Sequence, residues 1–297
     1  MAQIFSSLLY CTKKKVLNRN IKILVDKGSI TSFRKQLLDL FSEYQIIELD
    51  FSKIYQIETL IYTDQLFFFD KFNDEIFEYY NELAFYHRSK NKSFPSKFYI
   101  TRGNAPRRKV INDQQLIEFC RNNGYSIIDT AELSVFDQMS LFYDATNIIA
   151  SHGASGGNFF FVNNTIHFIE LFNENFANPC NTRILNSKGA FYACIINKNI
   201  NNNMDLEIDI SLLNSVISNN GYTMIKTKPA FHPIDIFDHV IKYLKADVKQ
   251  IYNSKLYEYK GDTAKQIIAI QEAVKLAPSN KLYATKLQEL INNSLES

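Results

Sequence analysis

The sequence has few cysteines, glycines and prolines. Its 297 residues include 4 Cys, 9 Gly, 6 Pro and no Trp. The cysteines lie far apart, and no two have Cys-x-x-Cys spacing: Cys11, Cys120, Cys180 and Cys194. This spacing argues against a structural zinc site and against a dense disulfide framework. We therefore expect reduced thiols in a cytoplasmic protein.

An excess of one charge and a long apolar run are also missing. Lys and Arg total 33 and Asp and Glu total 31, which gives a net charge of +2. This balance predicts no nucleic-acid partner and no polybasic membrane anchor. No run of 18 apolar residues is present, so no membrane-spanning helix is predicted. In residues 1–15 the apolar run precedes the charges, the reverse of a secretory signal.

Strand-like and helix-like segments alternate along most of the chain, which favours an α/β fold. In the first part the pattern predicts a helix over 33–41, capped by Thr31 or Ser32, and another over 74–89. It also predicts strands over 21–25, 46–49 and 57–62. The run Phe94-Pro95-Ser96 interrupts the periodicity and is expected to be a linker.

After the linker the alternation becomes regular. Asn112 and Ser134 are expected to cap helices that separate the strands. The strands are predicted over 98–100, 125–130, 147–151, 166–171 and 191–196. Strands separated by helices of about 10 residues are typical of a parallel, doubly wound sheet. We predict three parts: an α/β half over 1–95, a Rossmann-like half over 96–232 and a helical tail over 233–297.

The tail has little strand pattern. Residues 261–291 resemble one tetratricopeptide-like helical hairpin. A single hairpin cannot bury its own apolar face, so it is expected to pack on the α/β body or on a partner. The prediction for the tail therefore includes an assembly partner or a peripheral contact with the inner membrane.

A glycine-rich turn follows the apolar strand predicted over 147–151. It reads Ser151-His152-Gly153-Ala154-Ser155-Gly156-Gly157-Asn158. Small residues let a ligand approach the backbone, and free N–H groups at a helix start favour an anion. The alternative is a tight packing turn. The spacing is not G-x-G-x-x-G and no P-loop Lys follows, so a nicotinamide cofactor and ATP are both disfavoured.

A cationic loop follows the strand predicted over 98–100. Residues 101–109 read TRGNAPRRK, with four cations. Arginine suits bidentate contact with phosphate oxygens, although most such runs are solvated loops. Because both loops leave strand ends on one predicted edge, together they would form a diphosphate pocket. Glu170 is expected to end a strand on that edge, where it could bind a ribose diol or remain a surface residue.

The segment 98–172 resembles the core of glycosyltransferase family 61, whose bacterial members are often described as capsular polysaccharide biosynthesis proteins. The matching pieces are FYITRGNAPRRKVIND, then IIDTAELSVFDQMSLFYDATNIIASHGASGGNFFF, then IHFIELF. Their order and spacing carry the resemblance, which extends over roughly 20–200. Ser155, Gly156 and Gly157 stand where many relatives have Gly-Leu-Thr.

The resemblance implies a GT-B architecture, in which two Rossmann-like halves face a cleft and the second half holds the donor. It implies inverting transfer of a sugar from a nucleotide sugar, expected to be UDP-linked, to a glycan or lipid-linked acceptor. No cofactor and no metal are expected. The residues expected at the donor are Arg102, Asn104, Arg107, Lys109, His152, Gly153, Ala154, Ser155, Gly156, Asn158 and Glu170.

An inverting transfer needs a base for the acceptor hydroxyl. Asp26 and His152 are the candidates, and Asp64 and His87 are less favoured. The predicted product belongs to a surface polysaccharide or lipopolysaccharide. Two alternatives remain: a non-catalytic module that binds nucleotide sugars or glycans, and an interaction protein from which residues 234–297 could be removed without loss of nucleotide binding. In either case we expect Cys180→Ser to leave nucleotide binding unchanged.

Overall fold

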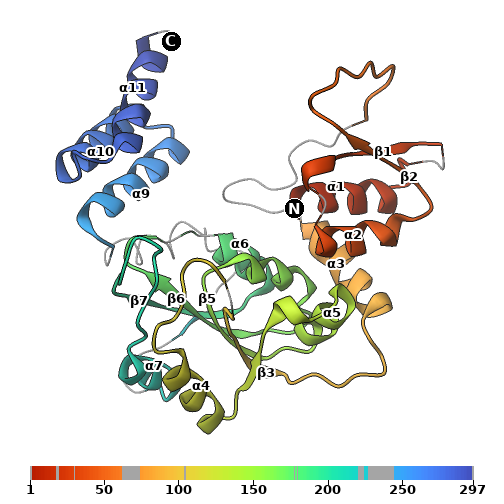
Figure 1. Ribbon diagram of the computed structural model, residues 1–297, viewed down its shortest axis with the longest axis horizontal. Coiled ribbons are helices and arrows are strands. Elements are labelled where there is room, and N and C mark those ends of the chain that lie inside the picture. The colour runs from red at the N-terminus through yellow and green to blue at the C-terminus, as the bar shows by residue number, and fades with distance from the viewer. Residues whose placement is uncertain are drawn as a thin grey trace. The chain divides into compact units, whose positions relative to one another are not determined.

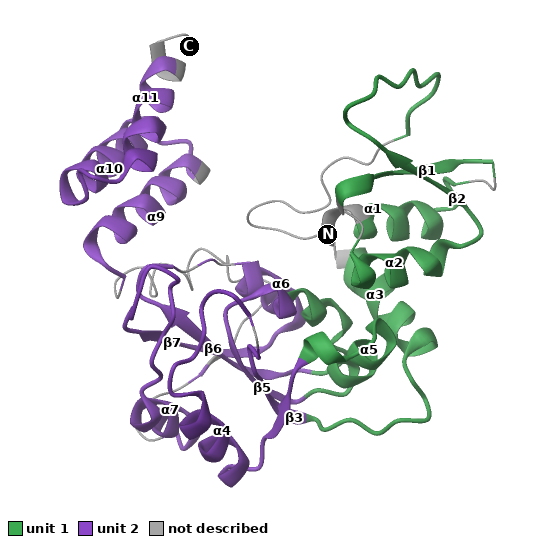
Figure 2. Cartoon of the chain, in the orientation of Figure 1, with its two compact units in different colours: residues 1–96, 130–145, 157–164 green, residues 97–129, 146–156, 165–297 purple. Residues whose placement is uncertain are grey.

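The computed structural model describes residues 2–17, 20–29, 31–61, 74–103, 105–176, 178, 180–219, 224–226 and 244–295. The chain divides into two compact units, coloured separately in Figure 2. Unit 1 comprises residues 1–96, 130–145 and 157–164, and unit 2 comprises 97–129, 146–156 and 165–297. This division differs from the sequence-based one, because two later segments join unit 1 and the tail groups with unit 2.

Unit 1 combines helices with a short parallel sheet. Its helices and strands are α1 (Ala2–Lys13), β1 (Lys22–Asp26), α2 (Ser32–Leu38), β2 (Gln45–Leu49), α3 (Asp74–His87) and α5 (Val135–Tyr143). Strands β1 and β2 pair in parallel, with Leu24 opposite Ile47. Three short 3-10 helices are also described in this unit. They are η1 (Lys27–Ser29), which follows β1, η2 (Asp39–Phe41), which follows α2, and η3 (Thr130–Glu132), which precedes α5. Helix α5 packs against α3, which explains why residues 130–145 belong to this unit.

Aromatic rings form much of the core of unit 1. Tyr80 of α3 stacks on Phe160, with ring centroids 4.7 Å apart, and packs against Phe5 of α1 at 5.7 Å. The Tyr80 hydroxyl hydrogen-bonds the buried Ser6 hydroxyl at 2.8 Å, which satisfies both polar groups. Large rings of this kind bury much apolar area per residue.

Two sequence predictions in unit 1 have opposite outcomes. The Thr31 cap is confirmed, because its side chain accepts a hydrogen bond from the Arg34 N–H at 3.3 Å. The strand predicted over 57–62 is wrong for residues 57–61, which have no strand structure. Ile57, Leu60 and Ile61 are exposed there, so their apolar side chains do not form the inner face of a sheet. Residue 62 lies outside the described residues.

Unit 2 contains a six-stranded sheet of order β4-β3-β5-β6-β7-β8. The strands are β3 (Lys97–Ile100), β4 (Ser126–Ile128), β5 (Asn147–Ser151), β6 (His167–Asn173), β7 (Phe191–Asn197) and β8 (Ile225–Lys226). The first five are mutually parallel, as predicted, and β8 adds to β7 in the antiparallel sense.

Helices cover both faces of this sheet, so its strands are apolar on both sides. The helices α4 (Asp113–Asn122) and α7 (Ile210–Ile217) lie on one side, and α6 (Cys180–Lys188) lies on the other (Figure 1). A buried cluster that includes Tyr99, Leu116, Ile149 and Leu213 joins the sheet to α4 and α7.

The helix starts around the sheet were predicted with mixed success. Ser134 caps α5, because its hydroxyl accepts the Asp137 N–H at 3.1 Å. Asn112 precedes α4 but forms no side-chain cap. Its amide instead donates to the Ile208 carbonyl and accepts the Ile208 N–H, both at 2.9 Å. A long-range contact therefore replaces the expected local one.

The glycine turn leads into a 3-10 helix, η4 (Ala154–Phe161), rather than the α-helix start that the sequence suggested. Residues 154–156 of η4 belong to unit 2, and residues 157–161 belong to unit 1. A 3-10 helix has tighter, less well aligned hydrogen bonds than an α-helix. The dipole of η4 therefore attracts an anion at this turn less strongly than the start of an α-helix would.

The tail contains α9 (Ala246–Tyr259), α10 (Thr263–Leu276) and α11 (Lys281–Leu295), which pack consecutively. Val248 and Tyr252 of α9, with Leu244 just before it, form a buried cluster with Phe172 of β6. Lys245 also pairs with Glu174, with the Nζ and Oε1 atoms 3.5 Å apart. These contacts explain why the tail groups with unit 2. In the part of the chain that the structure describes, no helix is long and apolar enough to cross a membrane.

Candidate anion-binding site

Two loops of unit 2 leave neighbouring parallel strands at the same edge of the sheet. Strands β3 and β5 are adjacent, with Ile100 opposite Ala150. The cationic loop continues from Ile100 and the glycine turn follows Ser151. Because both loops leave carboxyl ends of strands, Arg102 and His152 lie side by side, at the position where open α/β sheets bind ligands.

Two guanidinium groups converge on one carbonyl oxygen. The Nη1 atom of Arg102 lies 3.4 Å from the His152 carbonyl oxygen, and Nη1 of Arg108 lies 3.2 Å from the same oxygen. Arg102 also donates through Nη2 to the Arg107 carbonyl at 3.0 Å. Among the described residues neither arginine forms an ion pair. Both therefore keep their charge available to a ligand.

The surroundings of Arg102 and Arg108 disfavour the positive charges of both guanidinium groups. Burial lowers the pKa of Arg102, and the nearby Arg108 lowers it further. Burial also lowers the pKa of Arg108, with a contribution from Arg107. The Nε of Arg102 is buried and has no hydrogen-bond partner among the residues that the structure describes. Unpartnered buried donors and adjacent like charges cost free energy that an anion would offset.

The glycines of the turn permit this close approach. A Cβ atom at Gly153 would lie 2.5 Å from Nη1 of Arg102, so any larger residue would force the guanidinium to move from its place at the turn. A Cβ atom at the buried Gly156 would overlap the side-chain amide of Asn181. Gly157 has open space in the same direction. The first two glycines therefore admit side chains from elsewhere in the unit.

The His152 ring is buried in a polar and aromatic setting. Its Nδ1 atom lies 2.6 Å from Oε1 of Glu170, and its Nε2 atom lies 3.9 Å from Sγ of Cys180. The ring stacks on Phe172 with centroids 5.0 Å apart. Burial lowers the pKa of His152, but hydrogen bonds and charges from Cys180 and Glu170 outweigh it and raise the pKa to about 9. The imidazole therefore carries a proton on both nitrogens at neutral pH.

Glu170 lies inside β6 rather than at its end, because the strand continues to Asn173. Its side chain is completely buried. Besides His152, it accepts hydrogen bonds from Nδ2 of Asn181 at 2.6 Å and from the Tyr192 hydroxyl at 2.8 Å. Both carboxylate oxygens are engaged by the protein. Its oxygens therefore face His152, Asn181 and Tyr192 inside the unit rather than the surface at the end of the strand.

A family model described as Glycosyltransferase 61 matches residues 3–169, more than half of the chain. The chain belongs to glycosyltransferase family 61. The resemblance read from the motifs is thus confirmed, and membership of the family supports glycosyl transfer from a nucleotide sugar to a glycan acceptor. A search among curated proteins found no match. The family match covers both loops but ends just before Glu170 and before α6.

The other residues expected at the donor site differ in exposure and in the unit to which they belong. Arg107, Lys109 and Ala154 are exposed, and Ser155 is half-buried. The Lys109 N–H donates to Oδ1 of Asp205 at 2.7 Å, which anchors the end of the cationic loop. Asn158 is buried within unit 1, where its amide donates to Oε1 of Gln138 at 2.8 Å. Asn104 lies outside the described residues.

The candidate bases for a family 61 transfer lie in both units. Asp26 ends β1 in unit 1, and its Oδ1 accepts the Gly28 N–H at 3.0 Å. His87 ends α3 and is exposed, and Asp64 lies outside the described residues. In unit 2 both ring nitrogens of His152 have partners, and its raised pKa makes it a poor proton acceptor at neutral pH.

The sequence did not single out Arg108, Asn181 or Cys180. Arg108 belongs to the cationic run, but its positive φ of 58° turns its side chain toward His152 and carries no sequence signature. Cys180 and Asn181 begin α6, after the last motif, which ends at residue 172. Cys180 was expected to be a neutral position, whereas the structure places it against His152. A serine there would change a contact of the imidazole.

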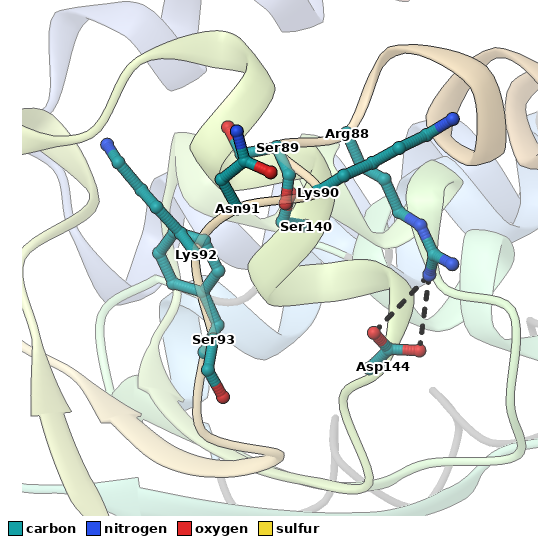
Figure 3. A pocket seen from close by; sticks show the side chains of 9 residues that line it. Arg88, Ser89, Lys90, Asn91, Lys92, Ser93, Ser140 and Asp144 are labelled. Carbon is teal, nitrogen blue, oxygen red and sulfur yellow. Dashed lines mark hydrogen bonds and ion pairs between the residues drawn. The ribbon is translucent and has the colours of Figure 1, made fainter.

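A second polar region lies within unit 1. A cavity of about 500 Å³ is lined by residues 88–94, Ser140 and Asp144 (Figure 3). Arg88 pairs there with Asp144, with the closest N···O distance 3.4 Å, and Lys92 pairs with Asp137 at 2.8 Å. Carboxylates thus compensate two of its cations. Among the described residues no carboxylate pairs with Arg102 or Arg108, so these two arginines are the stronger candidate for an anion site.

Proposed function

We propose that this protein is an inverting glycosyltransferase that holds a nucleoside-diphosphate sugar between the cationic loop and the glycine turn. The observation that carries the proposal is the convergence of Arg102 and Arg108 on the His152 carbonyl. Positive groups fixed in place stabilise the negative charge that develops on a diphosphate leaving group. With two arginines and a protonated histidine in this position, the reaction needs no metal ion.

The proposed architecture is GT-B, with unit 2 as the donor half. Its parallel sheet and the loops at its carboxyl edge support this assignment. Unit 1, with its own parallel strand pair, is proposed to bind a glycan or lipid-linked acceptor. We further propose that the product belongs to a surface polysaccharide or lipopolysaccharide made at the cytoplasmic side of the inner membrane. Uridine diphosphate is the proposed carrier of the sugar.

Binding of uridine diphosphate tests the donor site. Arg108→Ala and Arg102→Ala should each weaken binding by about tenfold or more, because each removes a charge-assisted contact worth roughly 1.5–3 kcal/mol. Arg121→Ala is the matched control, since Arg121 is exposed near the end of α4 and precedes the amino end of β4. Calorimetric titration at fixed ionic strength gives the dissociation constants. Equal affinity for all three variants would contradict the proposed site.

Asp26 is the proposed base. Asp26→Asn keeps an oxygen that can accept the Gly28 N–H, so the turn after β1 is preserved while the basic carboxylate is lost. Transfer should fall by about 10²–10⁴-fold, the usual contribution of a general base. Donor affinity should remain that of the wild type. Initial rates with a panel of nucleotide sugars and acceptors measure this effect, and undiminished transfer would eliminate Asp26.

A further inference from the structure

The imidazole of His152 is held by groups from several elements of unit 2. Phe172 of β6 and Phe176 pack on the ring, with centroids 5.0 and 5.4 Å away. Among the described residues, the titratable and charged groups that act on His152 or on its direct partners include Tyr99, Arg102, Arg107, Arg108, Glu170, Cys180, Arg183, Tyr192, Cys194 and Asp205. The ring is only 7% exposed, so these neighbours rather than solvent determine its protonation.

The buried carboxylate of Glu170 requires an opposite charge, and the His152 imidazole is placed to supply it. It has two neutral donors, Asn181 and Tyr192, and one imidazole partner. A fully buried carboxylate without an opposite charge costs several kcal/mol, and neutral hydrogen bonds recover only part of that cost. A proton on both nitrogens of His152 supplies the missing charge.

We propose that Glu170 is a positioning residue that keeps His152 in the imidazolium form, and that this buried ion pair sets the pH range over which the site accepts a diphosphate. The effect on diphosphate binding rests on the proposed function. The effect of Glu170 on the protonation of His152 concerns the protein alone and can be tested without any ligand.

The ion pair is linked physically to both arginines. The carbonyl of His152 itself receives Arg102 and Arg108. Phe176 packs against the His152 ring at 5.4 Å and lies beneath the Arg108 guanidinium at 5.2 Å. When His152 loses its proton, the ring no longer offsets the negative charge of Glu170, while the carbonyl of His152 still receives the two guanidinium groups. That charge repels a diphosphate, so affinity should fall as pH rises.

The direction of the pH effect follows from the same contacts. Burial lowers the pKa of His152, and the partners Cys180 and Glu170 raise it further than burial lowers it, to about 9. The wild type should therefore retain its site through pH 8. Without the carboxylate, burial is opposed only by Cys180, and the ring should lose its proton near or below its ordinary pKa of about 6.5.

The binding test compares Glu170→Gln with Tyr192→Phe. Both variants alter hydrogen bonding in the same buried cluster: Glu170→Gln turns one carboxylate oxygen into an amide donor and removes the charge, whereas Tyr192→Phe removes a hydroxyl donor and leaves the charge in place. The probe is uridine diphosphate at pH 5.5 and pH 8. The ratio of each variant's dissociation constant to that of the wild type cancels the titration of the ligand itself.

For Glu170→Gln this ratio should rise about tenfold between the two pH values, the effect of losing one nearby unit charge. For Tyr192→Phe it should change by less than about twofold. A flat ratio for Glu170→Gln, or the same change in both variants, would overturn the inference, because a purely structural role predicts no charge-specific pH effect.

Proton NMR of the ligand-free protein provides the second readout. The chain has 5 histidines, and the His152 signal is the one missing from His152→Gln. In the wild type and in Tyr192→Phe this signal should titrate above pH 8, and in Glu170→Gln at or below pH 6.5. A wild-type midpoint near 6.5 would overturn the inference even if Glu170→Gln fails to fold. If the wild type titrates as expected but binds no uridine diphosphate, the proposed function fails and the role of Glu170 in holding the imidazolium stands.

Discussion

At the scale of single residues, the three glycines of one turn have different surroundings. Gly153 makes room for Arg102, Gly156 makes room for Asn181, and Gly157 faces open space. These differences separate the glycines that the site requires from one that it does not. They also connect the turn to Glu170, because Asn181 donates to that carboxylate.

Gly156→Ala should destabilise the protein by about 1–3 kcal/mol. The new methyl group displaces the Asn181 side chain, which leaves a buried carboxylate with one donor fewer. Gly157→Ala is the matched control and should change stability by less than about 1 kcal/mol, since its methyl group meets no atom within 4 Å. Urea unfolding of both variants measures the difference. Equal stabilities would mean that Asn181 is free to move away at no cost.

At the residue scale, small residues after an apolar strand and arginines after its neighbour were enough to predict that Arg102 and Gly153 lie close together. That the two loops bind an anion stays a prediction. The surroundings of Glu170 could not be predicted, because its strand continues three residues further and its partners come from α6 and β7. Which of two adjacent arginines turns inward depends on backbone dihedrals that the sequence does not reveal.

At the scale of elements, α9 supports the strand that carries the site. Phe172 lies in the buried cluster with Val248 and Tyr252, and the same ring stacks on His152. The helix therefore belongs to the packing of unit 2. Removing residues 234–297 would remove Leu244, Val248 and Tyr252 from this cluster. The deletion would therefore disturb the packing around the nucleotide site as well as any binding of a partner by the tail.

Leu244→Ala should lower the free energy of unfolding by about 2–4 kcal/mol, because it leaves a cavity in this cluster. It should also weaken binding of uridine diphosphate, since Phe172 and with it His152 lose their support. Leu282→Ala in α11 is the control, because Leu282 is 72% exposed and should contribute less than about 0.5 kcal/mol. Denaturant unfolding and calorimetry measure the two effects. A destabilised Leu244→Ala that binds normally would show that α9 stabilises the fold without supporting the site.

The elements themselves were largely predictable from apolar runs and capping residues. The strand predicted over 147–151 coincides with β5, and those predicted over 98–100 and 191–196 differ from β3 and β7 by one residue each. Residues 57–61 of the expected strand 57–62 form no strand, because a short apolar run carries no information about a pairing partner. The start of η4 was expected to be α-helical, but a turn packed against Arg102 and Asn181 adopts a 3-10 form instead.

At the scale of the whole molecule, contacts between distant segments determine which parts fold together. Residues 130–145 and 157–164 return to unit 1 because α5 and Phe160 pack on α3. A boundary drawn from a Pro-Ser linker cannot include such returning segments. The two units are therefore interleaved along the chain, and neither can be isolated by a single cut.

Stability should fall between pH 6.5 and pH 8. The pKa of His152 is about 9 in the folded protein and about 6.5 when unfolded, so its contribution is complete below pH 6.5 and declines as pH rises toward 9. The loss by pH 8 is about 2 kcal/mol. Above pH 8 Lys188 opposes this trend, since burial lowers its pKa to about 8 and its cost is relieved as it deprotonates.

Urea unfolding at pH 6.5 and pH 8 checks this dependence. His152→Gln should remove most of the difference between the two values, and His87→Gln, at an exposed position, should leave it unchanged. A wild-type protein that gains stability over this range would contradict the raised pKa of His152.

The pair of arginines on one carbonyl has a practical consequence for biochemistry on this enzyme. Sulfate, citrate and inorganic phosphate all present several oxygens that two guanidinium groups can share. In such buffers these ions would compete with the nucleotide, and apparent Michaelis constants would rise with buffer concentration. Assays in chloride salts with a zwitterionic buffer should therefore reveal a tighter enzyme than assays in phosphate.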